Sequence, residues 1–159
     1  MRVLAIDPGF DRLGVAVVEG TSSHPFLVWS ACIEPSQGKP PQRLAEVYSA
    51  VLKIVKKYSP DRIAVESLFF SKNKKTALGV AEARGAILAA AGVVGMPVYE
   101  YSPQEVKIAV TGYGNAKKEA IMRMVPLLIK IPTGKKRDDE YDAIALGILA
   151  LSKRYPQDS

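Results

Sequence analysis

The chain opens with MRVLAIDPGF at residues 1–10, where an apolar run from Val3 to Ile6 ends on Asp7 and is followed at once by Pro8 and Gly9. A run of this length that contains β-branched residues and stops at Pro-Gly predicts a buried strand whose tip carries a carboxylate. That aspartate either shapes the turn, since Asp favours turns, or takes part in chemistry. The rest of the sequence has to decide between the two.

Further elements follow from patterns outside this stretch. Residues 13–19 and 25–33 read as two more strands, so that the first three strands form an antiparallel meander. Apolar residues spaced by three and four predict an amphipathic helix over residues 42–58. Residues 62–66 repeat the opening pattern, a short apolar strand that ends on an acid. The remaining expected elements are a polar, basic loop at 71–75, an alanine-rich helix at about 76–91, a strand at 97–101, and helices near 103–110, near 117–128 and from 138 or 139 to about 154.

This order predicts an α/β fold with a mixed five-stranded sheet, an antiparallel meander followed by parallel strands, and helices on both faces. A length of 159 residues, of which 48% are hydrophobic, suits one domain over residues 1–155 with a short polar tail at 156–159. The N-terminus lacks a signal-peptide core, and no stretch approaches the roughly 20 apolar residues of a bilayer span. The single cysteine, Cys32, excludes an intramolecular disulfide and a cysteine-based zinc cluster. We therefore expect a cytoplasmic protein without a membrane partner.

The charge of the chain favours a polyanionic partner. The net charge of +6 and the pI near 9.4 fit a nucleic-acid-binding protein, although a basic balance is also common in proteins that bind nothing charged. Either these side chains neutralise phosphates or they are solvated loop charges. The clustered basic residues are Lys72, Lys74, Lys75, Lys117, Lys118, Lys135, Lys136 and Arg137.

Four acids are the candidate catalytic residues. Asp7 and Glu66 end two predicted strands, and sites in open α/β sheets form at the carboxyl ends of strands. Asp139 and Asp142 are three residues apart on the last helix, which puts them on one face. Carboxylates directed at a core need a partner, and an all-oxygen set suits Mg²⁺ or Mn²⁺ rather than zinc. Four such acids could hold two ions about 3.5 to 4 Å apart, as in phosphodiester hydrolysis.

Each acid also has a structural interpretation. Glu66 alone would be an exposed strand-end charge, and Asp138 or Asp139 could cap the last helix. We prefer the capping role for Asp138, although Asp138 and Asp142 are four apart and could also share a helical face. The combination of two strand-end acids with a paired helical acid favours metal-dependent phosphoryl hydrolysis over these structural roles.

Short motifs along nearly the whole chain resemble those of the RuvC-type Holliday-junction resolvases, within the ribonuclease H-like superfamily. The motifs are Ile6-Asp7-Pro8-Gly9, Ala64-Val65-Glu66 with Phe69 and Lys72-Asn73, Ala83-Arg84-Gly85, Val106-Lys107, and Asp139 to Ala145. The resemblance implies a ribonuclease H-like sheet. It also implies a structure-specific DNA endonuclease that resolves Holliday junctions by paired, symmetric, divalent-metal-dependent nicks during homologous recombination and repair.

The resemblance assigns roles to individual positions. It implies that Asp7, Glu66, Asp139 and Asp142 bind two catalytic Mg²⁺ or Mn²⁺ ions. It implies that Lys107 and Lys118 contact phosphate near the scissile bond, with Lys117 as an adjacent alternative, and that Phe69 or its neighbour Phe70 stacks on bases. The same DNA surface would include Lys72, Asn73, Lys74 and Lys75. Core packing is the alternative for Phe69.

The resemblance also implies partners. It favours a homodimer, and the small side chains at residues 76–91 would allow close approach of another helix, either within the chain or across a two-fold axis. It further implies four-way junction DNA and a RuvA–RuvB branch-migration complex as partners. Two alternatives stay open: a ribonuclease H-like nuclease acting on another branched DNA or RNA substrate, and a non-catalytic junction-binding protein. An actin-like ATPase, which also begins with an acidic strand tip, would need a duplicated domain for which this chain is too short.

Overall fold

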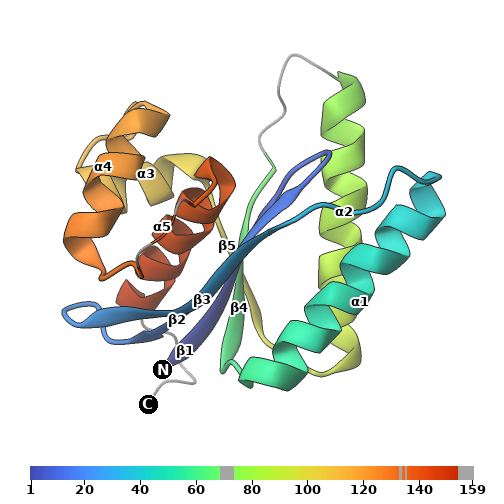
Figure 1. Cartoon of the computed structure of the whole chain (residues 1–159), viewed down its shortest axis with the longest axis horizontal. Coiled ribbons are helices and arrows are strands. Elements are labelled where there is room, and N and C mark those ends of the chain that lie inside the picture. The colour runs from blue at the N-terminus through green and yellow to red at the C-terminus, as the bar shows by residue number, and fades with distance from the viewer. Residues whose placement is uncertain (69–73, 133, 135, 154–159) are drawn as a thin grey trace.

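The computed structural model describes residues 1–68, 74–132, 134 and 136–153. Its centre is a five-stranded sheet with the strand order β3-β2-β1-β4-β5 (Figure 1). The strands are β1 (Arg2–Pro8), β2 (Leu13–Gly20), β3 (Pro25–Ile33), β4 (Arg62–Glu66) and β5 (Val98–Tyr101). The helices are α1 (Pro40–Tyr58), α2 (Lys74–Val93), α3 (Pro103–Thr111), α4 (Lys118–Leu128) and α5 (Asp138–Ser152).

The strand pairing confirms the expected mixed sheet. β2 pairs antiparallel with both β1 and β3, while β4 pairs parallel with both β1 and β5. In the parallel pair, Ile6 lies opposite Val65, so the next residue of each strand is an acid at the same edge of the sheet. The register therefore brings the two strand-end carboxylates of β1 and β4 side by side.

Helices cover both faces of the sheet, as Figure 1 shows: α1 and α2 lie on one side and α3, α4 and α5 on the other. The alternation of side chains along β1 explains this arrangement, because successive residues of a strand point to opposite faces. Leu4 and Ile6 belong to the core under α1 and α2, whereas Val3 and Ala5 belong to the core under α3, α4 and α5. All four are fully buried, so β1 is the central strand of both cores.

Some element boundaries differ from the predicted ones. β1 continues through Pro8, which pairs with Leu13, because a proline at the last position of a strand removes only one ladder donor. α1 begins at Pro40 rather than at residue 42, since prolines are tolerated in the first turn of a helix. α2 begins at Lys74, so the predicted loop at 71–75 is wrong for its last two residues. α5 ends at Ser152, and the tail at 156–159 lies outside the described residues.

The apolar length of α2 corrects another expectation. Its segment Thr76–Val93 has a mean hydropathy of 1.3 and is, by length and composition, long and apolar enough to cross a bilayer. A single such helix is weak evidence for a span, because core helices of globular proteins meet the same criterion. In the structure α2 packs beside α1 and buries positions spaced by three and four, the pattern of a helix laid with one face on a core. These positions are Ala83, Ile87, Ala90 and Ala91.

Candidate active site

The site begins where β1 and β4 end. Asp7 and Glu66 come from these neighbouring strands and share a hydrogen bond between their side chains. Across from Asp7 in the ladder lies Gly14 of β2, where any Cβ would clash with the carbonyl oxygen of Asp139. The glycine therefore lets the first turn of α5 come down onto the strand ends. A side chain there would hold the helix away from the sheet.

The first turn of α5 adds the second pair of acids. The side chains of Asp139 and Asp142 are 16% and 20% exposed, so both are turned inward rather than to solvent. Both act electrostatically on Asp7, with Asp142 as the stronger neighbour. The predicted constellation of four acids from β1, β4 and α5 is thus brought together at one edge of the sheet.

Gathering the acids makes them hard to ionise. Burial, followed by the charge of Asp142, raises the pKa of Asp7 from 3.8 to about 6. Burial, followed by the charges of Asp7 and Asp142, raises the pKa of Glu66 from 4.5 to about 8. Burial also raises the pKa of Asp142, although contact with Lys118 opposes the change. Since like charges and burial both disfavour the anion, Asp7 and Glu66 retain a proton between them near neutral pH.

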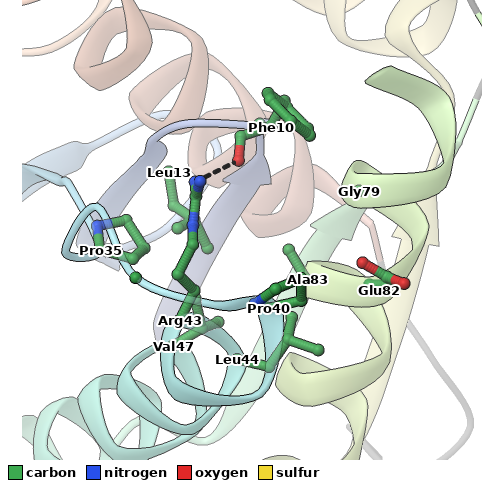
Figure 2. A pocket seen from close by; sticks show the side chains of 12 residues that line it. Phe10, Leu13, Pro35, Pro40, Arg43, Leu44, Val47, Gly79, Glu82 and Ala83 are labelled. Carbon is green, nitrogen blue, oxygen red and sulfur yellow. Dashed lines mark hydrogen bonds between the residues drawn. The ribbon is translucent and has the colours of Figure 1, made fainter. Parts of the chain in front are cut away.

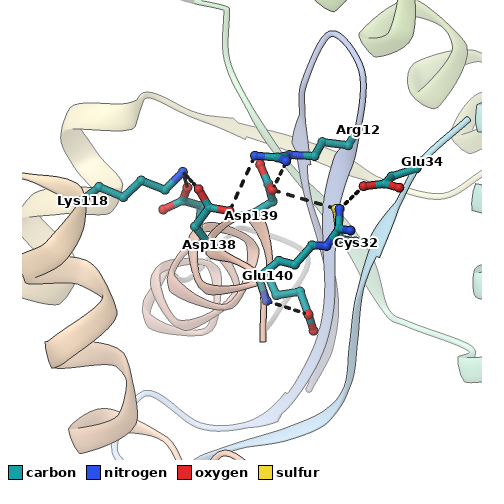
Figure 3. Close-up of polar contacts among 9 residues, drawn as sticks. Arg12, Cys32, Glu34, Lys118, Asp138, Asp139 and Glu140 are labelled. Atoms are coloured by element: carbon teal, nitrogen blue, oxygen red, sulfur yellow. Dashed lines mark hydrogen bonds and ion pairs between the residues drawn. The ribbon is translucent and has the colours of Figure 1, made fainter. Parts of the chain in front are cut away.

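Two cations of the chain hold the acids of α5 (Figure 3). Lys118 Nζ, at the start of α4, lies 2.9 Å from Asp142 Oδ2 and 3.0 Å from Asp138 Oδ2. Arg12 Nε, from the turn between β1 and β2, lies 2.7 Å from Asp139 Oδ2. Burial would lower the pKa of Lys118, but its contacts with Asp142 and Asp138 outweigh burial and raise that pKa. The predicted position of Lys118 beside the acids is therefore observed.

The expected capping role of Asp138 is wrong. The N-cap residue of α5 is Arg137, whose backbone is extended at φ −77° and ψ 156°, and Asp138 is the first residue of the helix. The Asp138 side chain pairs instead with Lys118 and, at 3.7 Å, with Arg12. The hydrogen bond from Lys118 lowers the pKa of Asp138. Asp138 thus stays ionised and helps to hold Lys118 at the site.

The other predicted DNA-binding residues fall into two groups. Lys107 of α3 and Lys117 line the same hollow as Asp7, Glu66 and Asp142. The hollow is open to solvent and has a volume of about 410 Å³. The remaining predicted residues in the segment after Glu66 carry no structural account: Phe69, Phe70, Lys72 and Asn73 lie outside the described residues, and of Lys74 and Lys75 only their place at the start of α2 is described.

The acids fit a divalent cation by chemistry but not by their present side-chain positions. An all-carboxylate set with raised pKa values suits a hard cation, which would relieve the repulsion between the acids. As the side chains stand, no three His, Cys, Asp or Glu residues of the described part of the chain gather closely enough to hold a metal ion. Asp139 and Asp142 already form ion pairs with Arg12 and Lys118, respectively. A bound cation would therefore have to replace the chain's own cations as their partner.

Two residues near the site, Arg12 and Glu140, were missed by sequence reasoning. Arg12 pairs with an acid 127 positions away, and no local pattern signals such a contact. Glu140 is 9% exposed and accepts hydrogen bonds from Ser30 Oγ at 2.6 Å and from the Arg137 backbone N–H at 3.1 Å. Burial would raise the pKa of Glu140, but these bonds outweigh it and lower that pKa. Its place three residues after the N-cap is a capping-box position and could have been recognised.

The turn that carries Arg12 is held from the opposite side by α1 and α2. Arg43 of α1 donates from Nη2 to the carbonyl oxygen of Phe10 at 2.9 Å, and its guanidinium carbon lies 5.6 Å from the Phe10 ring centroid (Figure 2). The Phe10 ring also lies against Gly79 of α2, where no Cβ would fit. These contacts fix the turn and with it the direction of Arg12.

Known proteins resemble this chain in sequence and in fold. A family model described as "Crossover junction endodeoxyribonuclease RuvC" matches residues 3–150. The crossover junction endodeoxyribonuclease RuvC of Brevibacillus brevis is 44% identical over 149 residues, which cover 93% of this chain and 90% of that protein. The solved structure of Thermus thermophilus RuvC in complex with a Holliday junction substrate is similar with a TM-score of 0.86 and 32% identity, over 94% of this chain and 92% of that one. The yeast mitochondrial Holliday junction resolvase has a TM-score of 0.70 at 14% identity over 94% of this chain and 77% of that one, a likeness of fold alone.

Proposed function

This chain belongs to the RuvC family of crossover junction endodeoxyribonucleases, and from that premise we propose that Asp7, Glu66, Asp139 and Asp142 are the centre of its Holliday-junction-resolving activity. The observation that carries this proposal is the convergence of four carboxylates from β1, β4 and α5, three of them in one hollow with lysines. Such crowding disfavours the ionised acids, and a cationic partner would relieve the repulsion between them. The proposal covers residues 1–155 as a single nuclease domain that works in the cytoplasm.

The proposed cofactors are two divalent cations, Mg²⁺ or Mn²⁺, held by these four acids. When bound, such cations offset the negative charge that develops on a phosphodiester during hydrolysis. To hold such cations, Asp7 and Glu66 would have to be ionised, and Asp139 and Asp142 would have to give up their contacts with Arg12 and Lys118. Lys118, once released from Asp142, and Lys107, which lines the same hollow, would contact a phosphate near the scissile bond, where a compact cation is well suited.

The proposed substrate is four-way junction DNA, and the proposed assembly is a homodimer. A two-fold symmetric pair of sites suits paired nicks in two strands of like polarity. The open face of α2 supports this assembly, because it includes small exposed residues, among them Gly85 and Ala89. We propose that Phe69 or Phe70 stacks on bases near the crossover, that Lys72 to Lys75 and Lys117 contact the backbone, and that a RuvA–RuvB complex is a further partner.

A nicking assay tests this proposal. Wild-type protein and Asp7→Asn are compared on a four-way junction, an unbranched duplex and an RNA–DNA hybrid, with Mg²⁺ and with EDTA. We expect symmetric, metal-dependent nicks on the junction alone, lost in Asp7→Asn while junction binding is kept or tightened, since a negative charge near phosphate is removed.

Two results would contradict the proposal. Cleavage that survives in Asp7→Asn, or in EDTA, would remove the acids and the metal from the reaction. Faster cleavage of the RNA–DNA hybrid than of the junction would mean that the substrate is different. Lys56→Ala, an exposed change on α1 far from the acids, is the control for general effects of substitution.

A further inference from the structure

The loop between α3 and α4 presents an aromatic ring on a fixed backbone. The Tyr113 N–H donates to Thr111 Oγ1 at 3.2 Å, and the Tyr113 carbonyl accepts the N–H of Ala116 at 3.2 Å. Thr111 is the last residue of α3, and its hydroxyl donates to the carbonyl oxygen of Lys107 at 2.8 Å. Before this loop, Gly112 ends α3 at φ 82°, a left-handed conformation that favours glycine.

The ring that this backbone carries is not packed on the protein. Tyr113 is 72% exposed, more than any other described aromatic side chain among the large exposed hydrophobics. Exposing an aromatic ring on a mobile segment would need no explanation. Here hydrogen bonds through its N–H and its carbonyl hold the backbone of Tyr113, so the exposed ring projects from a fixed point of the chain. Such a ring is ready to stack on a flat partner.

The surroundings of Tyr113 form a hollow next to the active site. This hollow has a volume of about 560 Å³, and its lining includes Tyr113, Arg123 and Met124. Asn115 and Ala116 line both this hollow and the one that contains Asp7, Glu66 and Asp142. The two hollows are therefore neighbours that share a wall. A ligand that extends from the acids across the shared wall reaches Tyr113.

Some cations near this surface are available to a ligand and others are not. Lys118 and Arg12 are paired with carboxylates. By contrast, Arg123 and Lys117 are exposed, and no carboxylate of the described residues pairs with either. Unpaired cations near an exposed ring are a combination that holds single strands of nucleic acid, since phosphates contact the charges and bases stack on the ring.

We propose that this second hollow binds the DNA strand next to the scissile phosphate, with Tyr113 stacked on a base and Arg123 against a phosphate. This inference rests on the proposed function, which places the cleaved DNA strand at the acids. The wall shared by the two hollows lets the same strand continue from the acids to Tyr113. Stacking on Tyr113 would accept any base, because every base has a flat face. With this hollow, the protein contacts at least one more nucleotide of the cleaved strand on one side of the active site.

The experiment measures binding separately from cleavage. Four-way junctions carry 2-aminopurine, a base whose fluorescence reports stacking, at one of the first three nucleotides on either side of the expected nick. They are titrated in EDTA with wild type, Tyr113→Ala and Tyr113→Phe. Tyr113→Ala should weaken binding about tenfold, the size measured for loss of one stacked base, and Tyr113→Phe should bind like wild type. The fluorescence at one labelled position should differ between Tyr113→Ala and wild type.

Arg123→Gln and Leu127→Ala complete the set. Arg123→Gln should reduce the slope of log affinity against log salt by about one, as expected for one lost phosphate contact. Leu127, on α4, is 77% exposed and lies outside the lining of the hollow, so Leu127→Ala should change neither affinity nor fluorescence. Thermal unfolding of each variant checks that the fold is intact.

The outcomes separate this inference from the proposed function. If Tyr113→Ala binds like wild type and no labelled position responds, the second hollow does not hold the strand, whatever the nicking assay shows. If wild type fails to nick the junction but Tyr113→Ala still loses affinity and signal, the proposed catalytic centre is wrong and the strand contact stands. Equal loss of affinity in Leu127→Ala would also overturn the inference, because the effect would then not depend on the hollow.

Discussion

The two alanine-rich helices of this protein, α5 and α2, are similar in composition but differ in how much of their surface is buried. Residues 143–151 of α5 are all buried, and the helix lies between the sheet and the helices α3 and α4. Within the stretch Thr76–Val93 of α2 only 22% of residues are buried, all of them toward α1 and the sheet. The contrast teaches that apolar composition does not tell an enclosed helix from one with a free face.

Glycine marks the same contrast in atomic detail. In α5, a Cβ at Gly147 would lie 2.6 Å from Val18 Cγ2 and 3.5 Å from Ala5 Cβ. In α2, a Cβ at Gly85 or Gly92 would have nothing within 4 Å. Gly147 therefore allows α5 to touch the sheet, whereas the glycines of α2 are open positions that weaken their helix. Identical substitutions at these sites should have opposite effects.

The largest expected effect is at Gly147. Gly147→Val would force a branched side chain against Val18 and Ala5, and we expect a loss of about 3 kcal/mol in the free energy of unfolding. Urea denaturation of wild type and variant measures the difference. Because α5 carries Asp139 and Asp142, junction cleavage should fall as well. A variant as stable as wild type would mean that α5 is less closely packed than α2.

The second effect concerns Asp7 and Glu66, the strand-end acids whose pKa values the charge of Asp142 on α5 helps to raise. The raised pKa values of Asp7 and Glu66, about 6 and about 8, mean that the folded protein binds protons more tightly than the unfolded chain does. Their contribution to stability is therefore full below about pH 4, the unfolded range of these acids. It is lost as the pH rises through about 6 and about 8.

Asp7→Asn should remove part of the stability loss that ionisation of these buried acids causes at high pH. In EDTA at pH 8 we expect the variant to be more stable than wild type by about 2 kcal/mol, which corresponds to several degrees in Tm, and equal to it near pH 4. Differential scanning calorimetry across this range gives the answer. With Mg²⁺ the gain should shrink or reverse, because the cation stabilises only the site that has its aspartate. A gain that does not change with pH would contradict the shared-proton interpretation.

The third effect is on the open face of α2. Gly85→Ala should raise the free energy of unfolding by about 0.5 to 1 kcal/mol, since alanine is the better helix former and the new methyl group meets nothing. Sedimentation of both proteins provides a second measurement. Unchanged sedimentation with a gain in stability would leave this face free at Gly85. A weakened dimer would instead show that a second copy approaches there.

The smallest effect is expected at Arg12. This side chain is 44% exposed and pairs with Asp139, so a divalent cation must replace it. Arg12→Ala should lower the Mg²⁺ concentration needed for half-maximal thermal stabilisation by about two- to fivefold, the scale of a partly exposed ion pair. Arg12→Lys keeps the charge and should change this concentration less. If Arg12→Ala requires more Mg²⁺ than wild type, Arg12 helps the metal to bind rather than competing with it.

The four acids could be proposed from the sequence because each lies at a position that a local pattern marks. Asp7 and Glu66 follow apolar strands, and Asp139 and Asp142 share a helical period. Sequence reasoning failed at Asp138, where the position before an apolar helix suggested a cap, because the actual N-cap depends on the backbone of Arg137. It could not find Tyr113 as an exposed ring, since an aromatic in a loop reads the same whether it is packed or free.

The sequence by itself determined a mixed sheet with an antiparallel meander and singled out the four acids, because periodicity, turn residues and resemblance act along the chain or between whole chains. Only the tertiary structure decided what surrounds the acids: Arg12 pairs with Asp139, Lys118 pairs with Asp142, and burial with neighbouring charge raises the pKa values of Asp7 and Glu66. The physical reason is that charge and burial act through space. Residues far apart in sequence set each other's pKa values only after the sheet register and the close approach at Gly14 have brought them within reach.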